Sequence, residues 1–107
     1  MAEVLTSIEE LRSRIDVIDD QLVRLLNVRV ACAVEVGRLK HEAGLPIYQP
    51  EREAQVLNGV RNSATELAGP LTAEAVVRIF ERIIDEARRA ERAASAQDEG
   101  LGNKTDE

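Results

Sequence analysis

The feature that most constrains this chain is a long, uninterrupted run of helical periodicity near its amino terminus. From Ile8 onwards, apolar residues recur at steps of three and four as far as Leu39, which places them on one face of an α-helix. Gly44 and Pro46 are residues that end helices. About 35 residues rising about 1.5 Å each span roughly 50 Å, whereas a compact domain of this length has a radius of gyration near about 13 Å. The pattern predicts a helix that needs a partner chain.

The start of this helix and two further helices are also predicted. Thr6 or Ser7 is expected to cap the first turn, with Glu9 completing a capping box. After a loop, Pro50 suits a first helical turn and opens a short second helix that fades over residues 62–65. A third helix is predicted to begin over residues 70–72. Its apolar residues share one face, namely Val76, Ile79, Phe80, Ile83 and Ile84.

The third helix is expected to end near Ala94, where the apolar pattern stops. Residues 95–107 have almost no apolar content, which predicts a polar, disordered tail. The expected architecture is therefore all-α, with three helices in a domain over residues 1–94. At 107 residues the chain is long enough for one domain, and so small a core favours self-association.

Composition excludes several classes of function. The formal net charge of −6 argues against a nucleic-acid or anionic-membrane surface, which needs a basic face. Cys32 is the only cysteine and His41 the only histidine, so the sequence predicts neither an internal disulfide nor a zinc or iron–sulfur site. The chain shows neither a secretory pattern nor an apolar span, so we expect a cytoplasmic protein.

Two cations on the long helix are candidates for binding an anion. Arg29 and Lys40 are eleven residues apart, which brings them within about 20° of one face and roughly 16 Å along the axis. The small residues Ala33 and Gly37 lie between them, together with Val36. The pair suits a compact anionic ligand held from both ends. Two solvated surface charges would give the same spacing.

Arg12 cannot join Arg29 at one small ligand. It precedes Arg29 by seventeen residues, roughly 25 Å along the axis and about 100° around it. If Arg12 is functional it serves the site of another subunit, which an antiparallel pairing of two long helices permits. The alternative is an ordinary surface arginine.

Polar residues on the other two helices complete the set of candidates. Residues 49–53, Gln-Pro-Glu-Arg-Glu, offer a third cation and hydroxyl-binding acceptors, or simply cap the second helix. Glu91 continues the apolar face formed by Phe80, Ile84 and Ala87. An acid in that position is either directed into a site or paired in solvent with Arg88 or Arg92.

Three segments resemble a known family. LRSRIDVIDDQLVRLLNVRVACAVEVGRLK, PIYQPEREAQVL and GPLTAEAVVRIFERIIDEARRAER together resemble the all-helical class of chorismate mutase, including the mutase portion of the bifunctional mutase–prephenate dehydratase. The resemblance covers about Ile8 to Arg92. It implies an intertwined helical homodimer that rearranges chorismate to prephenate, in the pathway to phenylalanine and tyrosine, without metal or cofactor.

The resemblance also implies roles for individual residues. Arg12 enters the site of the partner chain, while Arg29 binds a substrate carboxylate in its own chain. Lys40 reaches the ether oxygen and a carboxylate. Arg52 adds positive charge near the substrate, and Glu53 holds the ring hydroxyl.

Three positions vary within the family or depart from its best-known pattern. Gln49 stands where many members have an aspartate that helps to hold the hydroxyl, and its amide still accepts a hydrogen bond. Ala87 replaces a serine that donates to a carboxylate. Glu91 corresponds to a glutamine or glutamate beside the ether oxygen, and it donates a hydrogen bond only when protonated. Activity is therefore expected to fall as the pH rises through the titration of Glu91.

Two other functions fit the same helices. An isochorismate–pyruvate lyase would use a similar cationic pocket on an isomeric substrate, and fold does not separate the two. A non-catalytic regulatory dimer or helical adaptor would keep the apolar stripes but has no need of the pocket cations. The presence of Arg12, Arg29, Lys40 and Arg52 argues against that class.

Overall fold

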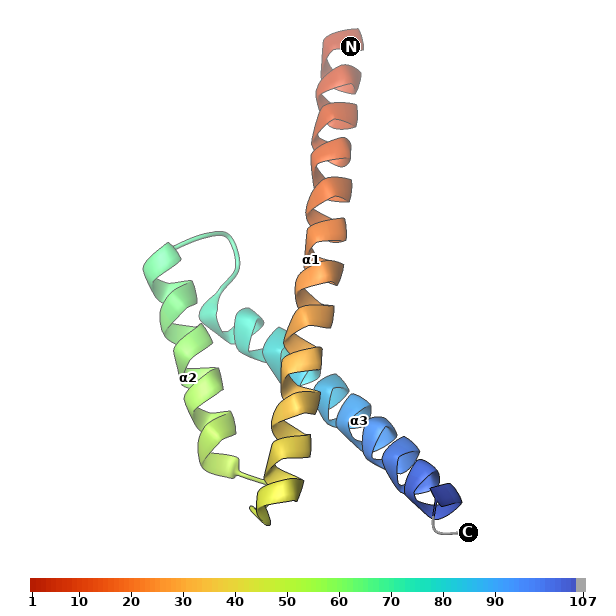
Figure 1. The fold of residues 1–107 in the computed structure, drawn as a ribbon. Helices are drawn as coiled ribbons and strands as arrows, with labels where there is room; N and C mark the ends of the chain where they lie inside the picture. The colour runs from red at the N-terminus through yellow and green to blue at the C-terminus, as the bar shows by residue number, and fades with distance from the viewer. Residues whose placement is uncertain (106–107) are drawn as a thin grey trace. The chain divides into compact units, whose positions relative to one another are not determined.

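The chain folds into helices joined by short loops. This computed structural model describes the backbone of residues 1–105 and the side chains of residues 1–97. Its three helices are α1 (Ala2–Ala43), α2 (Pro50–Leu67) and α3 (Ala73–Thr105), and residues 1–105 contain no strand (Figure 1). The predicted all-α class and the three helices are confirmed. The chain divides into two compact units, residues 1–31 and the part from Cys32 onwards, with the boundary inside α1.

The first unit is a single stretch of helix whose apolar face is open. No side chain of residues 1–31 is buried. Large apolar residues recur along the helix at steps of three and four, and Leu11 and Ile15 are both 53% exposed. The periodicity expected from the sequence is present, but nothing within this unit covers it.

The amino-terminal end of α1 corrects the sequence prediction. The helix begins at Ala2, six residues before Ile8, so Thr6 and Ser7 lie inside it. Their hydroxyl groups donate to the carbonyl oxygens of Ala2 and Glu3, each at 3.0 Å. The predicted cap at these residues is wrong, because a serine or threonine hydroxyl within a helix is satisfied by the carbonyl four residues earlier.

The carboxyl-terminal end of α1 matches the prediction. Gly44 adopts a positive φ of 68°. Its N–H donates to the carbonyl oxygen of His41 at 3.2 Å, and the N–H of Leu45 donates to that of Lys40 at 2.8 Å. This pair of hydrogen bonds is the Schellman motif, which uses glycine for its left-handed residue. The motif ends α1 one turn after Lys40.

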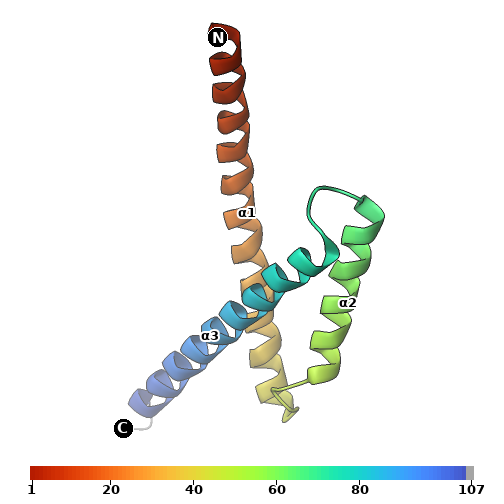
Figure 2. The ribbon, with the colours of Figure 1, turned by 180° about the vertical axis from the view of Figure 1, so that it is seen from behind.

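The second unit is built around the packing of α2 against α3. Figure 2 shows the loop over residues 68–72 that joins these helices. Thr72 caps α3, since its Oγ1 accepts a hydrogen bond from the N–H of Ala75 at 3.1 Å. Val77 and Ala87 are buried, and further apolar residues of both helices are half-buried, namely Val56, Leu57, Val60, Phe80, Ile83 and Ile84. These include most of the residues that the third-helix pattern selects.

Both later helices end beyond their predicted limits. α2 continues to Leu67, past the expected fading over residues 62–65. α3 continues to Thr105, past the expected end near Ala94, while the disorder of the tail over residues 95–107 stays a prediction. Residues 106 and 107 of that tail lie outside the described residues. Over residues 95–99, alanine, glutamine and glutamate favour helix even where no apolar face is present.

Candidate active site

The candidate residues are divided between the two units. The first unit holds Arg12, which is exposed, and Arg29, which is half-buried. The second unit holds the other six candidates, on the end of α1, the start of α2 and the middle of α3: Lys40, Gln49, Arg52, Glu53, Ala87 and Glu91. The geometry of this second group follows from contacts within one unit.

Glu91 lies against the last turns of α1. A β-carbon placed on Gly37 would stand 3.7 Å from both Cγ and Oε2 of Glu91. Lys40 follows Gly37 by three residues and therefore lies on the same face, one turn further along. Gly37, Lys40 and Glu91 are all half-buried. The structure thus brings the ammonium-bearing helix turn and the carboxyl group of Glu91 to one place.

The side chains of Lys40 and Glu91 are both available to a ligand. Within the described side chains, neither makes an ion pair or hydrogen bond. Among the described side chains Glu91 pairs with neither Arg88 nor Arg92, and Arg88 pairs with Glu53 and Asp85 instead. A half-buried acid and a half-buried ammonium group without fixed partners suit the binding of a polar, anionic molecule.

The neighbouring cation Arg38, unlike Lys40, is ion-paired within its own helix. Its guanidinium contacts Glu35 at 2.6 Å and Glu42 at 3.1 Å on the exposed side of α1. Hydrogen bonds from Arg38 lower the pKa of Glu35 below its ordinary value, and the same pairing raises the pKa of Arg38. Arg38 is therefore neutralised locally, and Lys40 supplies the available charge at this end of the helix.

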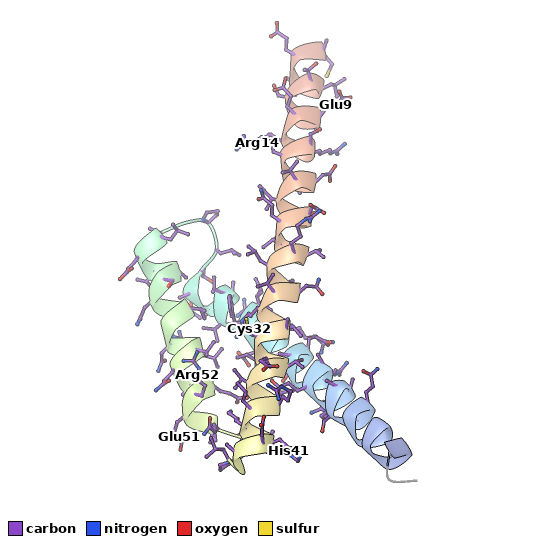
Figure 3. All side chains as sticks on the ribbon, viewed as in Figure 1. Glu9, Arg14, Cys32, His41, Glu51 and Arg52 are labelled. Atoms are coloured by element: carbon purple, nitrogen blue, oxygen red, sulfur yellow. The ribbon has the colours of Figure 1, made fainter. Side chains whose placement is uncertain are left out.

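Gln49 and Arg52 stand at the start of α2. The backbone carbonyl of Gln49 accepts hydrogen bonds from the N–H groups of Arg52 and Glu53, at 3.1 and 3.4 Å, but its side chain makes no capping hydrogen bond. Simple capping does not account for the amide. Arg52 is exposed in the first turn (Figure 3), and its guanidinium donates a 3.4 Å hydrogen bond to the side chain of Gln55. Both side chains can turn towards a ligand.

Arg88 is a residue that the sequence did not single out as part of a site. Its guanidinium forms an ion pair with Glu53 of α2 and another, at 3.2 Å, with Asp85 of α3. Its Cζ lies 6.0 Å from the centre of the Tyr48 ring, a cation–π distance. One sequence feature could have drawn attention to Arg88: it lies three residues before Glu91, which places both residues on one side of α3.

The surface around Lys40 includes a shallow apolar depression. Val36, Leu39, Lys40, Glu42, Ala43 and Leu45 line it, and it is open to solvent. A second open depression in the first unit is lined by Ser13, Arg14, Val17 and Ile18. Among the described residues, no three His, Cys, Asp or Glu side chains gather as a metal ion would need. The described helices contain no segment with the length and hydropathy of a membrane span.

Comparison with known proteins identifies the family. Residues 11–92 match the family described as chorismate mutase type II. The chain is 38% identical over 81 residues to the bifunctional chorismate mutase/prephenate dehydratase of Aquifex aeolicus, covering 75% of this chain and 22% of that protein. It is 32% identical over 63 residues to the chorismate mutase of Methanocaldococcus jannaschii, covering 59% of this chain and 64% of that one.

A solved structure supports the same assignment. Form II of the chorismate mutase from Thermus thermophilus superposes with a TM-score of 0.72 at 33% identity, covering 79% of this chain and 93% of that one. The expected resemblance is thereby confirmed in sequence and in fold. This chain belongs to the chorismate mutase type II family.

Proposed function

We propose that this chain catalyses the rearrangement of chorismate to prephenate. The observation that carries the proposal is the approach of Glu91 to Gly37, which sets an unpaired carboxyl group beside the helix turn of the unpaired Lys40. Family membership supplies the reaction, and the residues suit it. The chain spans about a fifth of the length of the bifunctional relative, so the proposal concerns the mutase reaction alone.

The reaction explains the choice of side chains. One C–O bond breaks as one C–C bond forms, so neither a nucleophile nor a general base is required. The protein must hold a flexible dianion in its reactive conformer and stabilise the negative charge that develops on the ether oxygen. Lys40 donates to that oxygen, and one such preorganised donor is worth about 2.7–4 kcal/mol in other enzymes.

The other candidates bind and orient the substrate. Arg29 grips a carboxylate, because a guanidinium offers two parallel N–H donors. Glu91, in its protonated form, donates a second hydrogen bond to the ether oxygen. Glu53 and Gln49 accept a hydrogen bond from the ring hydroxyl, and Arg52 adds positive charge. Ala87 contributes only a small apolar surface, which leaves one fewer donor than a serine would give.

The proposal includes a homodimer that completes the active site. The open apolar face of residues 1–31 needs a cover, and a second copy of the same face is self-complementary under two-fold symmetry. In such a pairing Arg12 serves the partner chain. The proposed setting is the cytoplasmic pathway to phenylalanine and tyrosine.

A product assay tests the proposed function. The chain is incubated separately with chorismate and with isochorismate, and the products are identified. We expect prephenate from chorismate and no pyruvate from isochorismate. Pyruvate release would favour the lyase, and no turnover of either compound would favour a non-catalytic dimer.

A variant tests the proposed site. Arg29→Ala should lower kcat/KM by at least about a hundredfold, because it removes a charge-assisted contact to the substrate. Arg24→Ala is the matched control, since Arg24 lies on the same helix and pairs with Asp20 in solvent. Equal activity in the two variants would move the site elsewhere.

A further inference from the structure

The ion pair between Arg88 and Glu53 joins α3 to α2. Arg88 is 37% exposed and Glu53 29% exposed, whereas the partners in the Arg24–Asp20 pair are 77% and 65% exposed. An exposed ion pair contributes little stability. Removing the cation from a partly buried carboxylate costs more, because the remaining charge is only partly solvated. The orientation of Glu53 therefore depends on Arg88.

Arg88 is itself held from several directions. Its Nη2 meets Glu53, its Nη1 meets Asp85 at 3.2 Å, and its guanidinium lies 6.0 Å from the Tyr48 ring. Its backbone follows Ala87, which is 4% exposed and fixed in the core. These contacts favour one orientation of the guanidinium. Arg88 thus supports a carboxylate on a different helix.

The geometry of the pair leaves one side of Glu53 for a ligand. Arg88 engages Oε1. A carboxylate has two acceptor oxygens, so Oε2 keeps its capacity to accept a hydrogen bond. Glu91 lies one turn after Arg88 and makes no ion pair with it. Arg88 therefore pairs with Glu53 and Asp85 and leaves Glu91 without an ion pair.

We propose that Arg88 is a positioning residue that holds Glu53 as an ionised, oriented acceptor for the ring hydroxyl of the substrate. This inference rests on the proposed function, in which Glu53 binds that hydroxyl. It assigns Arg88 a role through Glu53 rather than a contact with the reacting atoms. It also separates the two acids: Glu53 is tied to a cation as acceptor, and Glu91 is left without one as donor.

A double-mutant cycle tests the inference. The kcat and KM for chorismate are measured for the wild type, Arg88→Ala, Glu53→Ala and the double variant. We expect Arg88→Ala to lower kcat/KM about tenfold, mainly through KM, because a ground-state contact is lost. In the Glu53→Ala background the same change should alter kcat/KM less than about twofold. Arg88→Lys should recover part of the lost kcat/KM, since lysine keeps the positive charge but lacks the two parallel N–H donors of a guanidinium.

The control is the next residue on the helix. Arg89 pairs with Glu86 at 3.5 Å within α3, and Arg89→Ala should leave kcat/KM within about twofold of wild type. Thermal unfolding of each variant excludes a loss of fold, and Arg88→Lys carries the comparison if Arg88→Ala unfolds. The inference is overturned if Arg88→Ala acts equally in both backgrounds or matches Arg89→Ala. A wild-type chain without mutase activity would instead overturn the proposed function.

Discussion

Glu91 rests on the backbone of Gly37, with Oε2 3.7 Å from the point where a β-carbon would stand. That distance is an ordinary van der Waals contact, so Gly37→Ala should be accommodated. It should stabilise the chain by about 0.5–1 kcal/mol, because alanine is the better helix former. Gly37→Leu, by contrast, should displace Glu91 and lower kcat/KM by at least about tenfold. Chemical denaturation and steady-state kinetics measure the two effects.

Gly59 on α2 is the matched control, because a β-carbon there meets nothing within 4 Å. Gly59→Ala and Gly59→Leu should both stabilise the helix and leave the kinetics unchanged. If Gly37→Leu were as active as Gly59→Leu, the place of Glu91 in the site would be wrong.

The Glu35–Arg38–Glu42 cluster predicts a pH effect on the stability of the fold. The folded chain lowers the pKa of Glu35 below its ordinary value of 4.5, so this carboxylate stabilises the fold above that pH. The contribution is lost as the pH falls through the lowered pKa. The melting temperature of Glu35→Gln should lie below that of the wild type at pH 7, and the two melting temperatures should be equal near about pH 2.

Salt is the control for that cluster. Because the side chains are exposed, about 1 M NaCl should shrink the difference in melting temperature at pH 7. A difference that persisted at low pH and high salt would point to packing instead of charge.

Ala68 predicts a stabilising substitution. It ends α2 in the left-handed conformation, with φ 52° and ψ 39°, and its N–H donates to the carbonyl of Ala64. A β-carbon is disfavoured there, so Ala68→Gly should raise stability by about 0.5–1 kcal/mol. Ala54→Gly, at an exposed position inside α2, should lower it by about 0.8–1 kcal/mol. Denaturant midpoints check the sign, and a loss in both variants would contradict the strain argument.

Shared active sites predict complementation between inactive variants. If each site takes Arg29 from one chain and Arg12 from the other, a dimer of Arg12→Ala with Arg29→Ala contains one intact site. Random mixing after refolding together should restore about a quarter of wild-type activity. Arg29→Ala mixed with Lys40→Ala should restore none, because those residues serve the same chain's site. No recovery in the first mixture would place Arg12 outside the site.

Sequence reasoning succeeded where local chemistry decides the structure. Gly44 ends α1 because glycine readily adopts the positive φ that the Schellman motif requires. The predicted start of the third helix over residues 70–72 lies next to its observed start at Ala73. The place of Glu91 on an inward face followed from helical spacing. These features depend on neighbours within about one turn.

It failed where distant or competing preferences decide. The start of α1 was misplaced because Thr6 bonds backwards inside the helix as readily as it caps one. The end of α3 was misplaced because helix propensity acts without an apolar pattern. Arg88 was missed because its partner Glu53 lies on another helix, and no spacing along the chain reveals that approach.

In the proposed homodimer, the open apolar face of residues 1–31 makes activity depend on the concentration of the chain. An assembly held together by that face dissociates on dilution, since association depends on chain concentration. Specific activity should then be constant in concentrated samples and decline below the dissociation constant of the pair. In a cell, the concentration of this chain would set both the total amount of enzyme and the fraction of chains that are paired in dimers with complete active sites.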